Sequence, residues 1–436
     1  MREMKDSGIE WIGAIPANWS IMPIKYIKAD TKNSFVDGPF GSNLKSDHYV
    51  DDGDVYVVES GFISTGKFIY KDFKTITKEH FETIKRSECV EGDIIIAKIG
   101  ANYGMAGELP RLDKQSVVSG NSLKLTLNQE IMLNYLFIRQ LELAKNNGGF
   151  INIVNETAQP ALSLNSLNSF RLLVPPISEQ TTIVRFLYDK CTEIDYAITD
   201  IQSQIEALEE YKRSVITEAV TKGLDPDVEM RDSGIAWVGD IPAHWLVEKV
   251  KFHLQRNEPR NPGDKQVLSV YREYGVIPKD SRDDNHNVTS EDTSNYKYVV
   301  PGNLVINKMK AWQGSMGVSE YEGIVSPAYF IYKFTDNQIM PKYLHYLFRS
   351  CYKDEFRRIS GGIREGQWDL SPYEFSNTLL LIPPTDEQNR IVSYIDARIS
   401  EIESAITEKK QQIETIEEYK KSLIFEYVTG KKEVQA

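Results

Sequence analysis

The chain has 436 residues, of which 41% are hydrophobic and 26% are charged, and its formal net charge is -12. This length suggests two or three domains, and the composition excludes global disorder and fibrous repeats. No apolar run reaches the ~18 residues of a membrane helix, and the N-terminus has no apolar secretion signal, so we expect a cytoplasmic protein with no membrane contact.

The acidic charge lies outside two long blocks of the chain. Residues 20–172 carry 17 basic and 18 acidic side chains, and residues 246–380 carry 18 and 17. A nearly neutral block can still present a basic face, and net charge governs solubility more than it governs fold. The overall charge therefore argues only weakly against a partner as acidic as DNA.

The chain repeats its own motifs. The segment MKDSGIEWIGAIPANW at 4–19 returns as MRDSGIAWVGDIPAHW at 230–245, with 11 of 16 positions identical. LVPPISEQTTIV at 173–184 returns as LIPPTDEQNRIV at 381–392, and the diverged blocks between these motifs still align EGDIIIAK with PGNLVINK. Such self-similarity predicts two copies of one unit. Two binding domains with different targets would explain it, and a duplication that has only drifted is the alternative.

Two segments, 177–222 and 385–429, contain no Pro or Gly, and each follows a Pro-Pro pair. Each is predicted to form one long helix, with Ser178 and Asp386 as N-caps. At ~1.5 Å per residue such helices would be ~66 Å long, which is typical of projecting arms.

Apolar residues recur along both helices at alternating spacings of three and four, which is the pattern of a coiled-coil seam. We expect the helices to pack antiparallel within the chain and to dock a partner; packing of each helix on its own domain alone is the alternative. The residues expected in this seam are Ile194, Ile198, Ile201, Ile205, Leu208, Ile402, Ile406, Ile413 and Ile416.

The blocks between the motifs mix short β-rich runs with helical stretches, so we expect mixed α/β domains. In the first block, DGPFGSNLK at 37–45 has glycines that could turn backbone N–H groups toward an anion, although a plain turn explains them equally well. The strand GDIIIAK and the strand NLVINK are each followed by a polar, Gly-rich loop.

Asn, Gln, Lys and Arg side chains in these loops can hydrogen-bond base edges, and Lys can also reach phosphates. The alternative is ordinary surface polarity. The candidate DNA-binding residues in the first copy are Ser42, Lys45, Lys98, Asn102, Tyr103 and Gln159. Those in the second copy are Lys308, Lys310, Trp312, Gln313, Arg364 and Gln367.

No motif in the chain predicts catalysis. GFISTGKF at 61–68 has the spacing of a P-loop but ends in Phe68 where Mg²⁺ coordination needs Ser or Thr. The three cysteines have no CxxC spacing, so we expect no metal site. A nuclease site built from scattered carboxylates stays open, because sequence does not reveal spatial clusters.

The repeated DSGIEWIGAIPANW and DSGIAWVGDIPAHW, the PPISEQ and PPTDEQ helix starts, and the DGPFGSNLK, GDIIIAKIGA, QPALS and MKAWQGSMG segments resemble the specificity (S) subunit of type I restriction-modification systems. The resemblance covers essentially the whole chain. It implies target-recognition domains at 1–172 and 225–380, and long helices, the central and distal conserved regions, at 173–224 and 381–436.

The resemblance also implies a non-catalytic subunit whose two domains each read one half of a split site on double-stranded DNA. The helix pair would set the spacing and dock two methyltransferase (M) subunits, and restriction (R) subunits would join for cleavage. S-adenosylmethionine would belong to the M subunits and ATP with Mg²⁺ to the R subunits, so this chain would hold no cofactor. A protein-binding scaffold is the main competing interpretation; matching Lys, Asn, Gln and Trp residues in the loops favour DNA.

Overall fold

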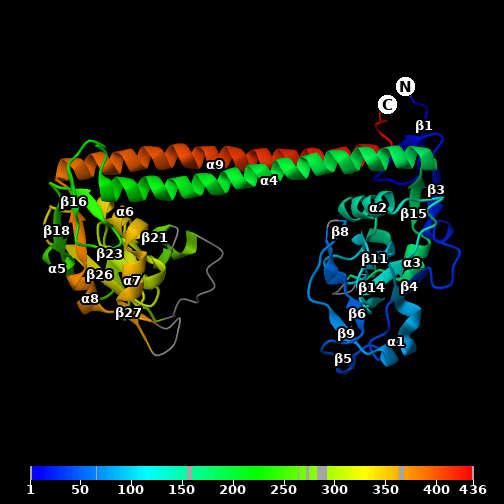
Figure 1. The fold of residues 1–436 in the computed structure, drawn as a ribbon, viewed down its shortest axis with the longest axis horizontal. Coiled ribbons are helices and arrows are strands. Elements are labelled where there is room, and N and C mark those ends of the chain that lie inside the picture. Colours follow the sequence, from blue (N-terminus) through cyan, green and yellow to red (C-terminus); the bar gives the residue numbers. More distant parts are fainter. Residues whose placement is uncertain are drawn as a thin grey trace. The chain divides into compact units, whose positions relative to one another are not determined.

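The computed structural model describes residues 2–64, 66–154, 160–263, 265–271, 274–281, 292–362 and 368–434. The chain divides into two compact units. Unit 1 comprises Met1–Asp200 and Gln412–Ala436, and unit 2 comprises Ile201–Gln411. Both units are mixed α/β, as the sequence predicts, and each contains part of both long helices (Figure 1).

The central sheet of unit 1 has the strand order β12-β11-β14-β4. Its strands are Phe35–Asp37 (β4), Ile94–Ala97 (β11), Ala106–Glu108 (β12) and Ser122–Leu125 (β14). The inner strand β11 reads IIIA and is buried along its whole length, because helix α2, Asn134–Asn146, covers one face of the sheet and other strands cover the other.

A second sheet in unit 1 has the order β10-β13-β6-β9-β5. Its strands are Tyr49–Val50 (β5), Val55–Val58 (β6), Lys74–Ile76 (β9), Glu88–Cys89 (β10) and Gln115–Val118 (β13). Helix α1, Lys78–Ile84, buries Phe81 and Ile84 against this sheet. The remaining elements are β1 (Met4–Asp6), β2 (Ala14–Pro16), β3 (Ser20–Pro23), β7 (Ile63–Ser64), β8 (Lys67–Phe68), β15 (Arg171–Val174) and α3 (Leu164–Asn168).

The central sheet of unit 2 has the order β24-β23-β26-β19, which matches the sheet of unit 1 strand for strand. Its strands are Leu254–Arg256 (β19), Leu304–Asn307 (β23), Met316–Val318 (β24) and Tyr329–Phe334 (β26). Helix α6, Pro341–Cys351, takes the place of α2. The other strands are β16 (Met230–Asp232), β17 (Asp240–Pro242), β18 (Leu246–Lys249), β20 (Leu268–Tyr271), β21 (Gly275–Pro278), β22 (Lys297–Val299), β25 (Gly323–Val325), β27 (Ser360–Gly361), β28 (Asp369–Leu370) and β29 (Leu379–Ile382).

The described part of unit 2 also contains the short α-helices α5 (Val250–His253), α7 (Lys353–Arg358) and α8 (Pro372–Asn377). The repeat predicted from sequence is therefore present in the structure: β1 and β2 correspond to β16 and β17, and the β3–β15 pair corresponds to the β18–β29 pair. The buried tryptophans Trp19 and Trp245 close the repeated motif in their respective units.

The long helices are α4, Ile177–Lys222, and α9, Thr385–Val428. Ser178 and Asp386 are not the N-caps predicted from sequence, because both lie inside the first turn. The helices begin directly after the Pro-Pro pairs, and the carbonyl groups of Pro176 and Pro384 accept the first helical backbone bonds. A proline can precede or open a helix because the first N–H groups have no intrahelical partner.

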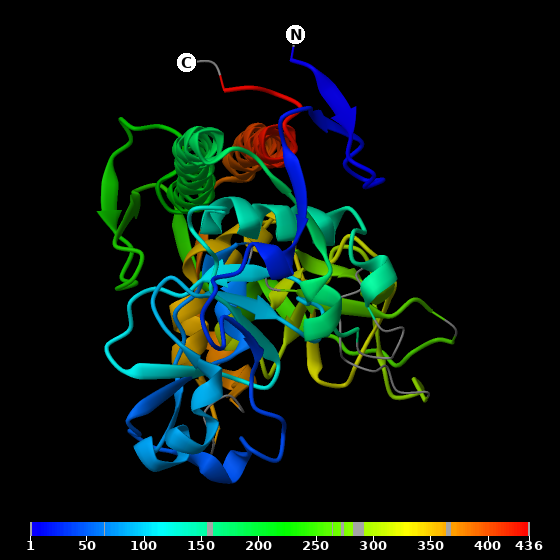
Figure 2. The same cartoon turned by 90° about the vertical axis from the view of Figure 1, so that its right-hand side faces the viewer.

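Within each unit, parts of α4 and α9 lie side by side and run antiparallel (Figure 1). In unit 1, Asp195 pairs with Lys420, and the rings of Phe186 and Tyr427 are 4.5 Å apart. In unit 2, Lys212 lies 3.6 Å from Glu403. Figure 2 views the helix pair end on, with the β1 hairpin and the C-terminal segment close together in unit 1, where Lys431 Nζ donates to the Ile12 carbonyl at 2.8 Å.

Candidate nucleic-acid interface

Each unit places a lysine directly after the inner strand of its central sheet. In unit 1, Lys98 follows β11, and its carbonyl oxygen accepts a hydrogen bond from Leu162 N at 2.9 Å. In unit 2, Lys308 follows β23, and its carbonyl oxygen accepts a hydrogen bond from Leu370 N at 2.8 Å. The two lysines are therefore held by the same backbone contact, which confirms that the two surroundings are structurally equivalent.

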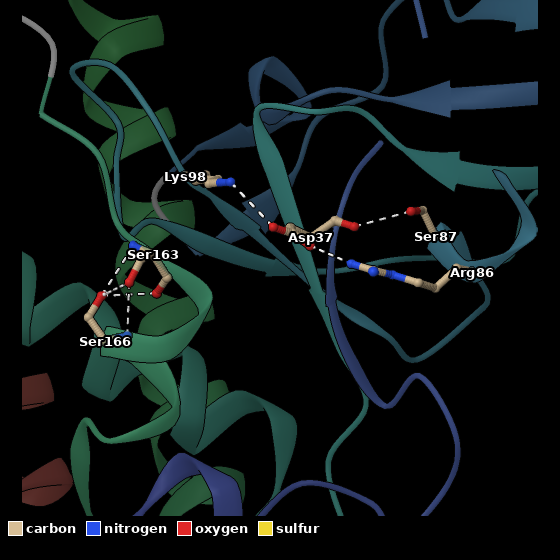
Figure 3. Close-up of polar contacts among 6 residues, drawn as sticks. All are labelled: Asp37, Arg86, Ser87, Lys98, Ser163 and Ser166. Atoms are coloured by element: carbon tan, nitrogen blue, oxygen red, sulfur yellow. Dashed lines mark hydrogen bonds and ion pairs between the residues drawn. The ribbon is translucent and has the colours of Figure 1, made fainter. Parts of the chain in front are cut away.

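The ammonium group of Lys98 is paired with Asp37, at 3.5 Å from Oδ2. Asp37 Oδ1 also accepts a hydrogen bond from Arg86 at 2.6 Å, so one carboxylate bridges two cations (Figure 3). Ser87 Oγ donates to the Asp37 carbonyl at 3.1 Å, which holds the end of β4 in place. The residue after Asp37, Gly38, has to be a glycine, because a Cβ there would lie 1.9 Å from the Ser119 carbonyl oxygen.

A hollow of about 350 Å³ opens beside Lys98 and Asp37 and is closed on the other side by residues 161–165. Ser163 caps α3 there: its hydroxyl accepts a hydrogen bond from Ser166 N at 3.0 Å (Figure 3). The exposed ring of Phe40 lies 5.9 Å from the Lys98 ammonium group. This cluster therefore offers cations, an aromatic face and hydroxyl groups on one surface.

The loop that follows Lys98 contains two predicted residues. Asn102 is exposed, and its carbonyl accepts a turn hydrogen bond from Met105 N at 3.0 Å. Tyr103 is half-buried, with the Lys145 ammonium group 3.1 Å from its ring centroid and the Phe150 ring 6.4 Å away. Burial lowers the pKa of Lys145. The ring of Tyr103 is therefore held in place by its neighbours and does not move freely.

Ser42 and Lys45 lie in the exposed loop after Phe40 and make their contacts locally. Ser42 Oγ lies 3.4 Å from Asn43 Oδ1, and the backbone N–H of Lys45 donates to His48 at 3.1 Å. These contacts do not link either side chain to the Lys98 cluster.

In unit 2 the ammonium group of Lys308 lies 3.1 Å from Asp369 Oδ2. The loop after it carries Trp312, whose ring lies 5.5 Å from that of Trp368 and whose Nε1 donates to the Met309 carbonyl at 3.1 Å. Lys310 is exposed, and its carbonyl accepts a hydrogen bond from Gln313 N at 3.0 Å. The equivalent surface of unit 2 is therefore an ion pair beside two indole rings.

The predicted residues Gln159, Arg364 and Gln367 lie outside the described residues. Sequence reasoning missed Asp37 and Arg86 as residues of the site. Asp37 belongs to the DGPFG segment, whose glycines drew attention in the sequence, whereas Arg86 is 49 residues from its partner Asp37 and no local pattern marks it.

The seam residues lie on the long helices in both units. Unit 1 contains Ile194, Ile198, Ile413 and Ile416, and unit 2 contains Ile201, Ile205, Leu208, Ile402 and Ile406. Ile402 and Ile406 are buried, and the other seven are partly buried. Closer to the domains, the same helices bury Ile183 and Leu187 in the core of unit 1, and Ile391 and Ile395 in the core of unit 2.

The described residues contain no group of three or more His, Cys, Asp or Glu side chains that could hold a metal ion. In that part of the chain no helix is long and apolar enough to cross a membrane.

These observations define a class of protein: a duplicated mixed α/β protein with two equivalent lysine clusters and a pair of long helices. The sequence profile of the type I restriction modification DNA specificity domain matches residues 22–207 and 253–415, which is most of the chain. The chain belongs to this family and carries its domain twice.

Known proteins agree with this assignment. The type I restriction enzyme MjaVIII specificity subunit of Methanocaldococcus jannaschii is 26% identical over 366 residues, covering 78% of this chain and 79% of the relative. The HsdS subunit from Thermoanaerobacter tengcongensis has a TM-score of 0.53 at 15% identity, covering 95% of this chain and 98% of that one. A chain from a structure of complex assembly and conformational transition of the type I R-M system has a TM-score of 0.65 at 13% identity. The match covers 95% of this chain and 99% of that one. At these identities the two structures support the fold alone.

Proposed function

We propose that this chain is the DNA-specificity subunit of a type I restriction-modification complex. Its domain at 1–172 would read one half of a split site, and its domain at 225–380 would read the other half. The observation that carries this proposal is the equivalence of Lys98 and Lys308, which have the same backbone contact but different side chains around them. One frame with two different polar surfaces is what two readers of different sequences need.

Two domains in one chain combine two weak half-site contacts, because the second contact becomes intramolecular. Half-sites on one face of the duplex recur at intervals of ~34 Å, one helical turn. In this proposal α4 and α9 set the spacing and dock two M subunits, and R subunits join the complex for cleavage. S-adenosylmethionine then belongs to the M subunits and ATP with Mg²⁺ to the R subunits. This chain itself catalyses no step, and the complex acts in the cytoplasm.

The test is to co-express the chain with the methyltransferase subunit encoded beside it and to map methylated adenines across the genome by single-molecule sequencing. The proposal predicts a split motif with a gap of fixed length. Exchanging residues 20–172 for the corresponding block of a relative should change one half of that motif only. A complex that forms and methylates a continuous motif, or an unchanged motif after the exchange, would contradict the two-reader arrangement.

The docking role of the helices has a separate test. Ile205→Asp and Ile413→Asp each place a charge in the partly buried seam, one in unit 2 and one in unit 1. We expect the double variant to lose assembly with M subunits in size-exclusion chromatography. The double variant Glu206→Gln and Glu414→Gln, on the exposed side of the same helices, is the matched control. Full assembly of the seam variant would exclude this role.

A further inference from the structure

The two units share a second feature at the edge of their central sheets: a carboxylate at the same register position. Leu123 in β14 and Phe330 in β26 are counterparts, because they pair with equivalent residues of β11 and β23. Asp37 lies opposite Leu123, and the register of β19 places Glu258 opposite Phe330. Asp37 and Glu258 are therefore equivalent residues, although they share no sequence context.

Each of these carboxylates bridges one arginine and one lysine. Asp37 joins Arg86 and Lys98, as described above. Glu258 accepts two hydrogen bonds from Arg256, from Nε at 2.8 Å and from a terminal nitrogen at 3.0 Å, and lies 3.0 Å from Lys297 Nζ. Burial of Glu258 opposes its ionisation, but the hydrogen bonds from Arg256 and Lys297 outweigh burial and lower the pKa of Glu258.

Both clusters adjoin the strand-end lysines. In unit 1 the link is direct, since Lys98 is itself paired with Asp37. In unit 2, Lys297 Nζ also donates to the Tyr329 carbonyl at 2.6 Å, and the preceding residue, Ala328, accepts the backbone N–H of Lys308 at 3.1 Å. The carboxylate clusters and the candidate interface are therefore parts of the same surface in each unit.

These contacts hold the arginine side chains but leave some of their N–H donors available. The side chain of Arg86 is 58% exposed and that of Arg256 is 43% exposed, whereas Asp37 and Glu258 are mostly buried. Among the described residues, Asp37 is the only hydrogen-bond partner of Arg86, and Glu258 is the only one of Arg256. Each guanidinium group thus keeps outward N–H donors. The two hydrogen bonds to Glu258 fix the plane of the Arg256 guanidinium group, and the single hydrogen bond to Asp37 restrains Arg86 at one nitrogen.

This arrangement suits a base edge better than a phosphate. A carboxylate cancels part of the positive charge that attracts the DNA backbone, so it weakens a phosphate contact. It also orients the guanidinium group in advance, most strongly where it accepts two hydrogen bonds, as Glu258 does from Arg256. A planar fork of two donors matches the O6 and N7 acceptors of guanine in the major groove. Orientation before binding reduces the entropy lost on binding.

We infer that Arg86 and Arg256 each read one guanine, one in each half of the split site, and that Asp37 and Glu258 are the positioning residues that orient them. This inference rests on the proposed function and adds the base that each domain reads at one position. Arg86 and Arg256 come from different elements of the two units, so the guanines are expected at different positions in the two halves.

The test uses the full chain in complex with its methyltransferase subunit and a plasmid library in which each position of the mapped motif is varied. Arg86→Lys keeps the charge but loses the planar fork, so preference for guanine should fall about tenfold at one position of one half. Arg256→Lys should do the same in the other half only. Asp37→Asn and Glu258→Gln should relax the same positions as their arginine partners, with a smaller fold-change.

The unaffected half of the motif reports that each variant is folded and assembled. Lys85→Met, which removes an exposed cation next to Arg86, is the control and should leave base preference unchanged. An equal change in methylation for every base, with guanine preference retained, would identify phosphate contacts and overturn the inference. If the motif is split but no guanine in it responds to either arginine variant, the guanine inference is overturned and the proposed function stands. If the wild-type complex shows no split motif, the proposed function is overturned together with the inference.

Discussion

Units 1 and 2 have the same four-stranded central sheet, yet the structures beside that sheet differ. Unit 1 adds a five-stranded sheet with its own apolar core around Val55, Val57 and Phe81. In the described part of unit 2, the pairs β20–β21 and β22–β25 take the place of that sheet and are linked by a single parallel bridge between Val267 and Ile324. The difference shows that the frame tolerates large changes on one side, because the shared core packs on the helices and not on the added strands.

A finer comparison concerns two adjacent residues at the start of each long helix. Gln180 and Gln388 are fully buried and make the same three hydrogen bonds in their units. The neighbouring carboxylates have different partners: Glu179 pairs with Arg2, whereas Glu387 accepts a hydrogen bond from the indole N–H of Trp245 and also contacts the exposed ring of His244. A buried polar group has few ways to be satisfied, whereas a group near the surface can change partners.

The largest expected effect comes from breaking the shared glutamine contact. Gln388→Leu keeps the volume but leaves the backbone N–H of Met340 and two carbonyl groups without partners, so unit 2 should lose about 3 kcal/mol of stability. Gln180→Leu should do the same to unit 1. Hydrogen exchange of each unit measures the loss, and Gln412→Leu, at an exposed position of α9, is the control. Similar stability of buried and exposed variants would contradict the prediction.

A pH effect should distinguish the two units. Burial lowers the pKa of His345 to about 4 from an ordinary value of 6.5, and nearby Arg349 and Lys342 add to the shift. The unfolded state then binds the proton more readily, so unit 2 should lose stability as pH falls from 6.5 toward 4, by about 3 kcal/mol in total. Counted from the equivalent N-caps Leu133 and Met340, the counterpart in unit 1 is Ile138, which cannot titrate.

His345→Ile copies the residue of unit 1 into unit 2 and should remove most of this pH dependence. Urea denaturation at pH 7 and at pH 4.5, followed by hydrogen exchange in α6, measures it. An unchanged loss of stability in the variant would assign the acid sensitivity to other groups.

The carboxylates at the helix starts predict a smaller difference. Glu387→Ala should cost about 2 kcal/mol, because it leaves the buried indole N–H of Trp245 without a partner. Glu179→Ala should cost about 1 kcal/mol, because Trp19 Nε1 already has no hydrogen-bond partner among the described residues and Arg2 can reach water. Equal losses in chemical denaturation of the two variants would show that the tryptophan contact is not what separates them.

The smallest effect is expected for the ion pairs between the long helices. Asp195 pairs with Lys420 in unit 1, and the equivalent Glu403 pairs with Lys212 in unit 2. Burial opposes ionisation, but Lys420 and Lys67 lower the pKa of Asp195, so its contribution is present at neutral pH and is lost as pH falls through that lowered pKa. Because these groups are partly exposed, Asp195→Asn and Glu403→Gln should each cost less than about 1 kcal/mol. A larger loss in thermal denaturation would show that the helix pair depends on these charges.

Much of the frame could be predicted from sequence. The repeated motifs, the two Pro- and Gly-free helices and the strands before Lys98 and Lys308 are local patterns, and local patterns follow from backbone preference and periodicity. Both helix starts, Ile177 and Thr385, agree with the prediction, but the N-caps were misplaced by two residues. The side chains of Ser178 and Asp386 matched a capping signal, although the Pro-Pro pair already opens each helix.

The candidate site was predicted only in part. Lys98 and Lys308 lie at strand ends, where sequence can place them, but their acidic partners come from unrelated segments. Asp37 meets Arg86 across 49 residues of chain, and the equivalence of Asp37 with Glu258 appears only in the register of two edge strands. Pairing at that distance is decided by which strands become neighbours, and no local pattern encodes this.

By itself, the sequence determined that this protein is two copies of one α/β unit with a long helix in each copy, because hydrophobic periodicity and repetition are properties of the chain. Only the tertiary structure decided which charges meet. Sheet order brings one carboxylate in each unit between an arginine and a lysine, and burial makes that pairing obligatory, since an unpaired carboxylate there would be costly.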